Sequence, residues 1–180
     1  SPAQPTLFVC NHVSYLDIEA LGASVAGSFV AKSEVASWPL FGQLARLQRS
    51  VFIERRPSRA AGHRDAIAAR LDDGDNIILF AEGTSSDGSR VLPFKSALFA
   101  VAERARVVQP VSIAYTRLNG APLPSRLRPD VAWYGDRELA GHLWNFLGLG
   151  RLPLVVELHP TVAARDFPSR KDLADHCQRV

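Results

Sequence analysis

Short apolar runs alternate with helical patterns along most of the chain, and this alternation restricts the fold more than any other feature. The apolar runs are rich in Val, Ile and Phe, as buried strands are. They predict strands at residues 6–10, 28–32, 50–55, 76–82, 107–115, 129–135 and 152–160. The intervening segments predict helices at residues 15–25, 38–47, 58–72, 94–104, 138–147 and 169–179. Strand-then-helix alternation indicates the α/β class: a single layered domain with a mostly parallel central sheet flanked by helices.

Length, charge and cysteine content indicate the number of domains, the kind of partner and the cellular compartment. At 180 residues the chain has the length of one domain, so residues 1–180 are expected to form one. A net charge of +3 favours an anionic surface or substrate, and no nucleic-acid partner is expected. Cys10 and Cys177 lie at opposite ends without CxxC spacing, which indicates a reducing compartment and argues against a disulfide or zinc framework.

The sequence contains no methionine, not even at position 1. We therefore expect the chain to be a segment of a longer protein. It shows no signal peptide and no run of about 18 apolar residues. Any membrane anchor is expected upstream of Ser1. The segment 117–129, RLNGAPLPSRLRP, is rich in Pro, Gly and Arg and is expected to be a surface loop.

The segment NHVSYLD, residues 11–17, follows the apolar run TLFVC and precedes a helical pattern. Ser14 and Asp17 have the spacing of a capping box, so one interpretation is purely structural and makes His12 a loop residue. The other is catalytic, because an imidazole at a strand end can act as a general base if a carboxylate fixes its tautomer. His12 and Asp17 are about 140° apart around an ideal helix, so they can pair only if His12 precedes the helix. The two interpretations are compatible, because the cap would position the dyad.

Two further polar clusters follow strand candidates. FIERR, residues 52–56, is either a solvated strand end or an anion site, because arginine binds phosphate or carboxylate in a bidentate fork. EGTSSDG, residues 82–88, is either a polar turn or a loop whose N–H groups cradle an oxyanion. The chain has no GxSxG, GxxxxGK[ST], GxGxxG or HExxH motif. The absence of these motifs argues against four classes: serine hydrolases, P-loop NTPases, nucleotide-binding Rossmann units and zincins.

In this order, NH-x-x-x-x-D, FIERR, EGT and VVQPVSI resemble the motifs of the glycerolipid acyltransferase family typified by bacterial 1-acylglycerol-3-phosphate acyltransferase. The resemblance runs from residue 9 to about residue 115 and includes LPFKSALF. It implies acyl transfer from acyl-CoA or acyl carrier protein to the hydroxyl of a lyso-lipid, with no resident cofactor and no metal. It also implies work at a membrane surface, the cytoplasmic face of the bacterial inner membrane.

The resemblance further implies roles for individual residues. His12 would be the general base, and Asp17 its orienting partner. Four residues match the acceptor-binding motifs of the family: Arg55, Glu82, Gly83 and Thr84. Three more fall at positions that touch the acceptor or form the wall of the site: Asn11, Ser85 and Pro110.

The sequence departs from the family pattern F-P-E-G-T-R-S at two positions. Ala81 replaces the proline, and Ser85 replaces the arginine that is the expected phosphate partner. FAEGTSSDGSRVLPFKSALF, with WYGD at 133–136 and HLWNF at 142–146, is more similar to the lyso-ornithine-lipid acyltransferase branch. There the acceptor is a 3-hydroxyacyl amide of ornithine, with a carboxylate and an amine instead of a phosphate. The alternatives are a 1-acylglycerol-3-phosphate acyltransferase that makes phosphatidic acid, and a lipid-binding module that has lost catalysis.

Overall fold

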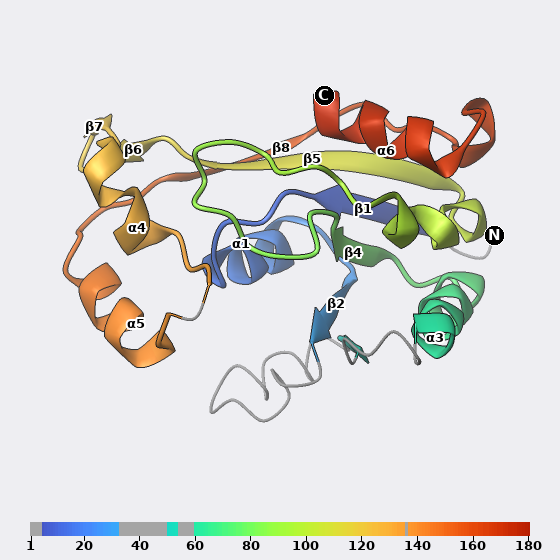
Figure 1. Ribbon diagram of the computed structural model, residues 1–180, viewed down its shortest axis with the longest axis horizontal. Helices are drawn as coiled ribbons and strands as arrows, with labels where there is room; N and C mark the ends of the chain where they lie inside the picture. Colours follow the sequence, from blue (N-terminus) through green and yellow to red (C-terminus); the bar gives the residue numbers. More distant parts are fainter. Residues whose placement is uncertain (1–4, 33–49, 54–59, 136) are drawn as a thin grey trace.

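A six-stranded sheet in the order β3-β2-β4-β1-β5-β8 forms the centre of the protein (Figure 1). The structure is a computed structural model that describes residues 5–32, 50–53, 60–135 and 137–180. The strands are β1 (Thr6–Cys10), β2 (Ser28–Lys32), β3 (Val51–Ile53), β4 (Ile77–Phe80), β5 (Val107–Tyr115) and β8 (Leu154–Leu158). The first five are parallel, and β8 is antiparallel to β5 at the sheet edge. This confirms the predicted α/β class with a mostly parallel sheet.

Alternate side chains of each strand supply two hydrophobic cores, one on each face of the sheet. On one face Leu7 and Val9 pack with α3 (Ala60–Asp72), the 3₁₀ helix η3 (Ser96–Arg104) and α6 (Arg170–Arg179). On the other face Phe8 and Cys10 pack with α1 (Leu16–Ser24) and α4 (Arg128–Val131).

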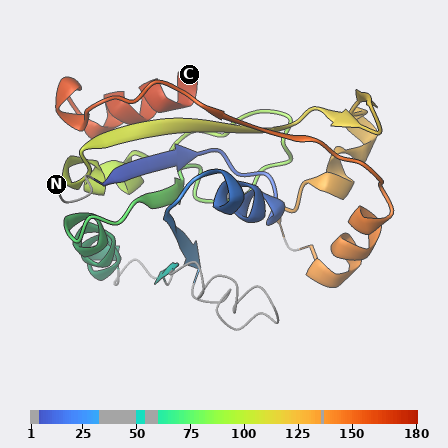
Figure 2. The same cartoon turned by 180° about the vertical axis from the view of Figure 1, so that it is seen from behind.

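The remaining elements lie at one end of the molecule, away from α3 (Figures 1 and 2). They are β6 (Arg117–Leu118), β7 (Ala121–Pro122), the 3₁₀ helix η4 (Ser125–Leu127) and α5 (Leu139–Leu147). A last 3₁₀ turn, η5 (Ala164–Asp166), precedes α6. β1 lies between β4 and β5, so the segments that follow these three parallel strands meet beyond their carboxyl ends. The candidate site forms there.

Most element predictions are confirmed, within a few residues at the ends. Three strands have the predicted bounds: 6–10, 28–32 and 107–115. The helix predicted at 58–72 ends at Asp72, as expected, and Gly74 beyond it has the positive φ of 88° that is common after a helix C-terminus. The helix predicted at 94–104 is present as the 3₁₀ helix η3. The helix predicted at 38–47, and residues 54 and 55 of a predicted strand, lie outside the described residues.

Two predictions are wrong. Residues 129–135 do not form a strand: α4 covers Arg128–Val131, with Pro129 in its first turn, where a missing N–H and a fixed φ cost nothing. Residues 117–129 are not a plain loop, because β6 and β7 pair as a hairpin. Asn119 and Gly120 both have positive φ, 50° and 85°, as a two-residue hairpin turn requires.

Both cysteines are buried and unpaired. Burial raises the pKa of the Cys10 thiol above its usual range, and that of Cys177 to about 12. Both thiols are therefore unreactive at neutral pH. Among the described residues, no helix has the length and apolarity needed to cross a bilayer.

Candidate active site

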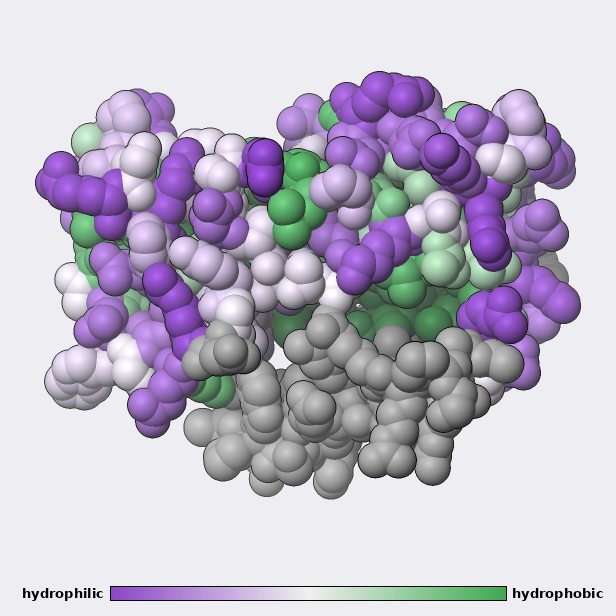
Figure 3. Space-filling model, viewed as in Figure 1, coloured by the Kyte–Doolittle hydropathy of each residue, from purple (hydrophilic) through white to green (hydrophobic). Residues whose placement is uncertain are grey.

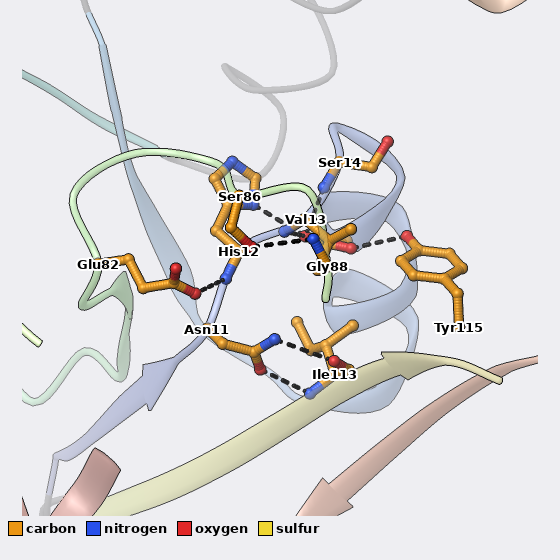
Figure 4. Close-up of polar contacts among 10 residues, drawn as sticks. Asn11, His12, Val13, Ser14, Glu82, Ser86, Gly88, Ile113 and Tyr115 are labelled. Carbon is orange, nitrogen blue, oxygen red and sulfur yellow. Dashed lines mark hydrogen bonds and ion pairs between the residues drawn. The ribbon is translucent and has the colours of Figure 1, made fainter. Parts of the chain in front are cut away.

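The site begins where β1 ends, at Asn11. The Asn11 side-chain amide donates to the Ile113 carbonyl at 2.9 Å and accepts from the Ile113 N–H at 2.8 Å (Figure 4). The side chain thus replaces the next backbone pair of the β1–β5 ladder and lets the main chain leave the sheet. Asn11 is buried by this pairing, so its structural task is to fix the start of the following loop.

His12 and Asp17 form the predicted pair. The imidazole Nδ1 lies 2.8 Å from the Asp17 Oδ2. The same oxygen accepts from the backbone N–H groups of Val13, at 2.7 Å, and Ser14, at 2.9 Å. His12 is in the loop and Asp17 in the first turn of α1, which is the arrangement that allows contact over five residues. The Asp17 side chain is fully buried, whereas the His12 side chain is 18% exposed.

The second oxygen of Asp17 binds a residue that sequence reasoning missed. The Tyr115 hydroxyl, at the end of β5, donates to Asp17 Oδ1 at 2.6 Å (Figure 4). Burial, reinforced by the neighbouring Asp17 charge, raises the pKa of Tyr115, so its hydroxyl stays a neutral donor. Asp17 therefore receives four hydrogen bonds from four residues, which hold both of its oxygens in place.

This arrangement defines which nitrogen of His12 can act as a base. A charged carboxylate at Nδ1 favours the tautomer with its proton there, which leaves Nε2 as the acceptor. No described residue hydrogen-bonds Nε2. The ring stacks on Phe80 with centroids 3.9 Å apart and an interplanar angle of 21°, which fixes its plane. The geometry therefore provides an oriented, partly exposed general base.

The capping-box prediction is wrong for Ser14. Tyr15 occupies the N-cap position of α1 and makes no side-chain cap. The Ser14 hydroxyl is buried, and it has no hydrogen-bond partner among the residues that the structure describes. The Asp17 N–H that it would have bonded donates instead to the Ser14 backbone carbonyl, at 3.0 Å. The Asp17 carboxylate still accepts from backbone N–H groups that precede the helix, as the acidic residue of a capping box does.

The loop after β4 is fastened to the backbone of His12 at two points. The His12 N–H donates to Glu82 Oε1 at 2.8 Å, and the Ser86 N–H donates to the His12 carbonyl at 2.8 Å. Glu82 Oε2 accepts from the Leu92 N–H at 3.0 Å. Burial raises the pKa of Glu82, and the two N–H donors oppose that shift. Glu82, 1% exposed, thus holds the loop against His12.

The rest of the loop lies beside the base. Gly83 follows Glu82 with φ of 68°. Thr84 is exposed and Ser85 is half-buried, so both can meet a ligand. Asp87 accepts from both the N–H and the hydroxyl of Ser89, which lowers its pKa and makes it a turn residue.

One predicted site residue, Pro110, does not lie beside the imidazole, and another is not among the described residues. Pro110 is buried within β5 and pairs with Val9, which belongs to the core on the face of η3 and α6. Phe80, on which His12 stacks, packs in the core of the opposite face. Arg55 lies outside the described residues. Among the residues that the structure describes, no group of three or more metal-ligating side chains gathers.

Tyr115→Phe tests whether Tyr115 positions the dyad. Removing the hydroxyl leaves Asp17 Oδ1 without its donor and loosens the orientation of the pair. We expect kcat to fall about 3–10-fold with little change in KM, since a hydrogen bond to a charged group contributes about 1.5–3 kcal/mol and only part of it acts in the transition state. Tyr134→Phe, which changes a half-buried tyrosine outside the dyad, is the matched control. An unchanged kcat in folded Tyr115→Phe would mean that the hydroxyl only supports the fold.

Known proteins resemble this chain over nearly all of its length. The sequence model of a family described as Acyltransferase matches residues 1–114. The chain is 47% identical over 179 residues to a lyso-ornithine lipid O-acyltransferase of Brucella abortus, covering 94% of this chain and 67% of that protein. It is 43% identical to one of Rhizobium meliloti, covering 95% and 62%. It is 33% identical to a 1-acyl-sn-glycerol-3-phosphate acyltransferase of Neisseria meningitidis, covering 97% and 68%.

A solved structure has the same fold. The crystal structure of the 1-acyl-sn-glycerophosphate acyltransferase of Thermotoga maritima matches with a TM-score of 0.68 and 25% identity, over 98% of this chain and 63% of that one. The chain spans about two thirds of the length of these relatives.

Proposed function

The chain belongs to the acyltransferase family, and from that premise we propose that it moves a fatty acyl group from acyl-CoA or acyl carrier protein to the hydroxyl of a lyso-lipid. The preferred acceptor is lyso-ornithine lipid. The observation that carries the proposal is the oriented base: His12 Nδ1 is held by buried Asp17, and Nε2 has no partner among the described residues.

In the proposed reaction, the acceptor hydroxyl gives its proton to His12 Nε2 while its oxygen attacks the thioester carbonyl. The C–S bond then breaks, and the leaving thiolate takes the proton from the imidazolium. Asp17 stabilises the imidazolium between these steps. An acyl-enzyme is not required, and the nearby Cys10 and Ser14 are buried. The reaction as proposed uses no metal and no resident cofactor.

The choice of acceptor rests on the loop after β4. Ser85 stands where family members carry an arginine, and a phosphate group usually recruits fixed cations. The relatives at 47% and 43% identity are named lyso-ornithine lipid O-acyltransferases, which supports the same acceptor here. Asp87 is engaged by Ser89, so an interaction of Asp87 with the ornithine ammonium gains no support.

A panel of acceptors with one acyl-CoA tests this choice. We expect the full-length protein to use lyso-ornithine lipid better than lysophosphatidic acid. Ser85→Arg should raise relative activity on lysophosphatidic acid by about tenfold, because a charge-assisted hydrogen bond contributes about 1.5–3 kcal/mol. Ser24→Arg adds the same charge at the exposed end of α1 and should not change the ratio. Equal or better use of lysophosphatidic acid by the unaltered protein would favour the glycerophosphate reaction.

That second candidate, synthesis of phosphatidic acid from 1-acylglycerol-3-phosphate, is supported by the Neisseria relative and the solved structure. The first is favoured because the corresponding arginine is absent here and because the lyso-ornithine relatives have higher identity. A non-catalytic lipid-binding module is disfavoured by the assembled base.

We place the reaction at a membrane surface, the cytoplasmic face of the inner membrane. Trp144 is 79% exposed and Leu147 is 68% exposed on α5, which carries no Asp, Glu, Lys or Arg over its nine residues. Exposed Trp and Leu on an uncharged helix suit the boundary between headgroups and acyl chains. Hydrophobic side chains also gather in the middle of the face drawn in Figure 3, where they would favour contact with the acyl chains of lipids.

A further inference from the structure

Lys95 lies flat against the loop that contains Glu82 and Gly83. A Cβ atom built on Gly83 would be 3.0 Å from both Cδ and Nζ of Lys95, and 3.2 Å from Cε. The Lys95 N–H also donates to the Ala81 carbonyl at 2.9 Å, which fixes the lysine backbone to the same loop. Because Gly83 has no side chain, the lysine stem rests on the main chain, and its ammonium lies beside this glycine.

The loop that Lys95 contacts is fastened to the backbone of His12. Glu82 holds it at one end and Ser86 at the other, each at 2.8 Å. Gly83, Thr84 and Ser85 are the three residues between the two fastenings. A cation held against Gly83 therefore borders the surface on which an acceptor would meet the imidazole.

The two carboxylates of the loop are already engaged, whereas the Lys95 ammonium is not. The Glu82 carboxylate is buried and accepts from two backbone N–H groups. Asp87 accepts twice from Ser89. Lys95 is exposed, and neither a hydrogen bond nor a salt bridge joins its ammonium to any residue that the structure describes. Its charge is available for a ligand.

Resting on the function proposed above, we propose that Lys95 binds the anionic group of the acyl acceptor, the carboxylate of the ornithine head group. Lys95 thus supplies the cation that Ser85 does not. An ammonium is a compact charge with three rotatable donors, which suits a single carboxylate, whereas an arginine fork suits phosphate in a bidentate manner. Serine at 85 and lysine at 95 would together shift the preference toward the ornithine acceptor.

The phosphates of an acyl-CoA donor are a second source of negative charge, so the test must separate acceptor from donor. We would measure apparent KM and kcat of the full-length protein in mixed micelles, varying lyso-ornithine lipid and acyl-CoA in turn. The variants are Lys95→Gln, which removes the charge, and Lys95→Arg, which keeps it. Lys171→Gln is the matched control, because Lys171 is equally exposed but lies on α6.

We expect Lys95→Gln to raise KM for lyso-ornithine lipid at least tenfold and to change KM for acyl-CoA less than twofold. Lys95→Arg should retain most of the affinity, and Lys171→Gln should behave as the unaltered protein. The methyl ester of lyso-ornithine lipid adds a second test. The unaltered protein should bind it as weakly as Lys95→Gln binds the free acid, and Lys95→Gln should cause no further loss.

Several outcomes would overturn the role of Lys95 while leaving the proposed function intact. They are an unchanged acceptor KM, an increase confined to acyl-CoA, or an equal loss with the ester and the free acid. An inactive unaltered protein on every acceptor would instead overturn the proposed function, and the role of Lys95 with it. Near-ultraviolet circular dichroism of each variant verifies that the fold is retained.

Discussion

His12→Ala is expected to lower kcat/KM by roughly 10²–10⁴-fold, the usual contribution of general acid–base catalysis. The imidazole is held by Asp17 through Nδ1 and stacked on Phe80, so that Nε2 has a fixed direction. No neighbouring side chain among the described residues can replace it: Ser14 is buried, and Glu82 is bound to two N–H groups. The variant should remain folded, because His12 contributes a partly exposed ring and its backbone contacts survive the substitution.

The measurement is thiol release from acyl-CoA with and without lyso-ornithine lipid. His176→Ala, which removes a histidine from α6 on the far face of the sheet, serves as the control and should keep normal turnover. A folded His12→Ala protein with near-normal, acceptor-dependent thiol release would contradict the assignment of the base.

Asp17→Asn should reduce both rate and stability. The fully buried carboxylate accepts from His12, Val13 and Ser14 through one oxygen and from Tyr115 through the other. An amide can keep these contacts only by turning its NH₂ toward the tyrosine hydroxyl, which must then accept instead of donate. The negative charge that stabilises the imidazolium is lost in either orientation. We expect a rate loss of about 10²-fold or more.

The accompanying loss of stability is expected to be about 1–3 kcal/mol, the range for hydrogen bonds to a charged group. For a domain of this size that corresponds to a fall in Tm of roughly 2–12 °C. Activity must therefore be normalised to the folded fraction, measured by urea denaturation of the same preparation. If the normalised rate were unchanged, the Asp17 charge would have no part in the reaction, and the carboxylate would serve only the start of α1.

The dyad was predictable because its partners are close in sequence. A histidine before a helix and an aspartate in its first turn can meet by local geometry alone. The central strands were predictable for a similar reason, since parallel strands buried on both faces are continuous apolar runs. The run at 76–82 extends beyond β4 at both ends. At one end the Asn76 side chain bonds the backbone of Thr6 and Ala26, and at the other Glu82 already belongs to the site.

The errors have identifiable causes. The apolar content of the segment 129–135 predicts a strand, but Pro129 favours a helix start, and tertiary packing buries Val131 and Ala132. Asn119-Gly120 is a typical two-residue hairpin turn, but the surrounding Pro and Arg residues favour a loop. Tyr115 had no signal at all, because its contact with Asp17 spans 98 residues and exists only once β5 lies beside β1.

The order of the strands in the sheet also determines when the catalytic group comes into existence as the chain is synthesised. Both members of the dyad lie near the amino end, yet their supports come from Glu82, 70 residues later, and from Tyr115. Contacts of such long sequence separation form late, because loop closure opposes them until the sheet assembles. A chain that has emerged only as far as α3 holds His12 and Asp17 without the loop after β4 or the end of β5. We therefore expect the nascent protein to lack activity until β4 and β5 have joined β1, so that the appearance of activity reports assembly of these three central strands.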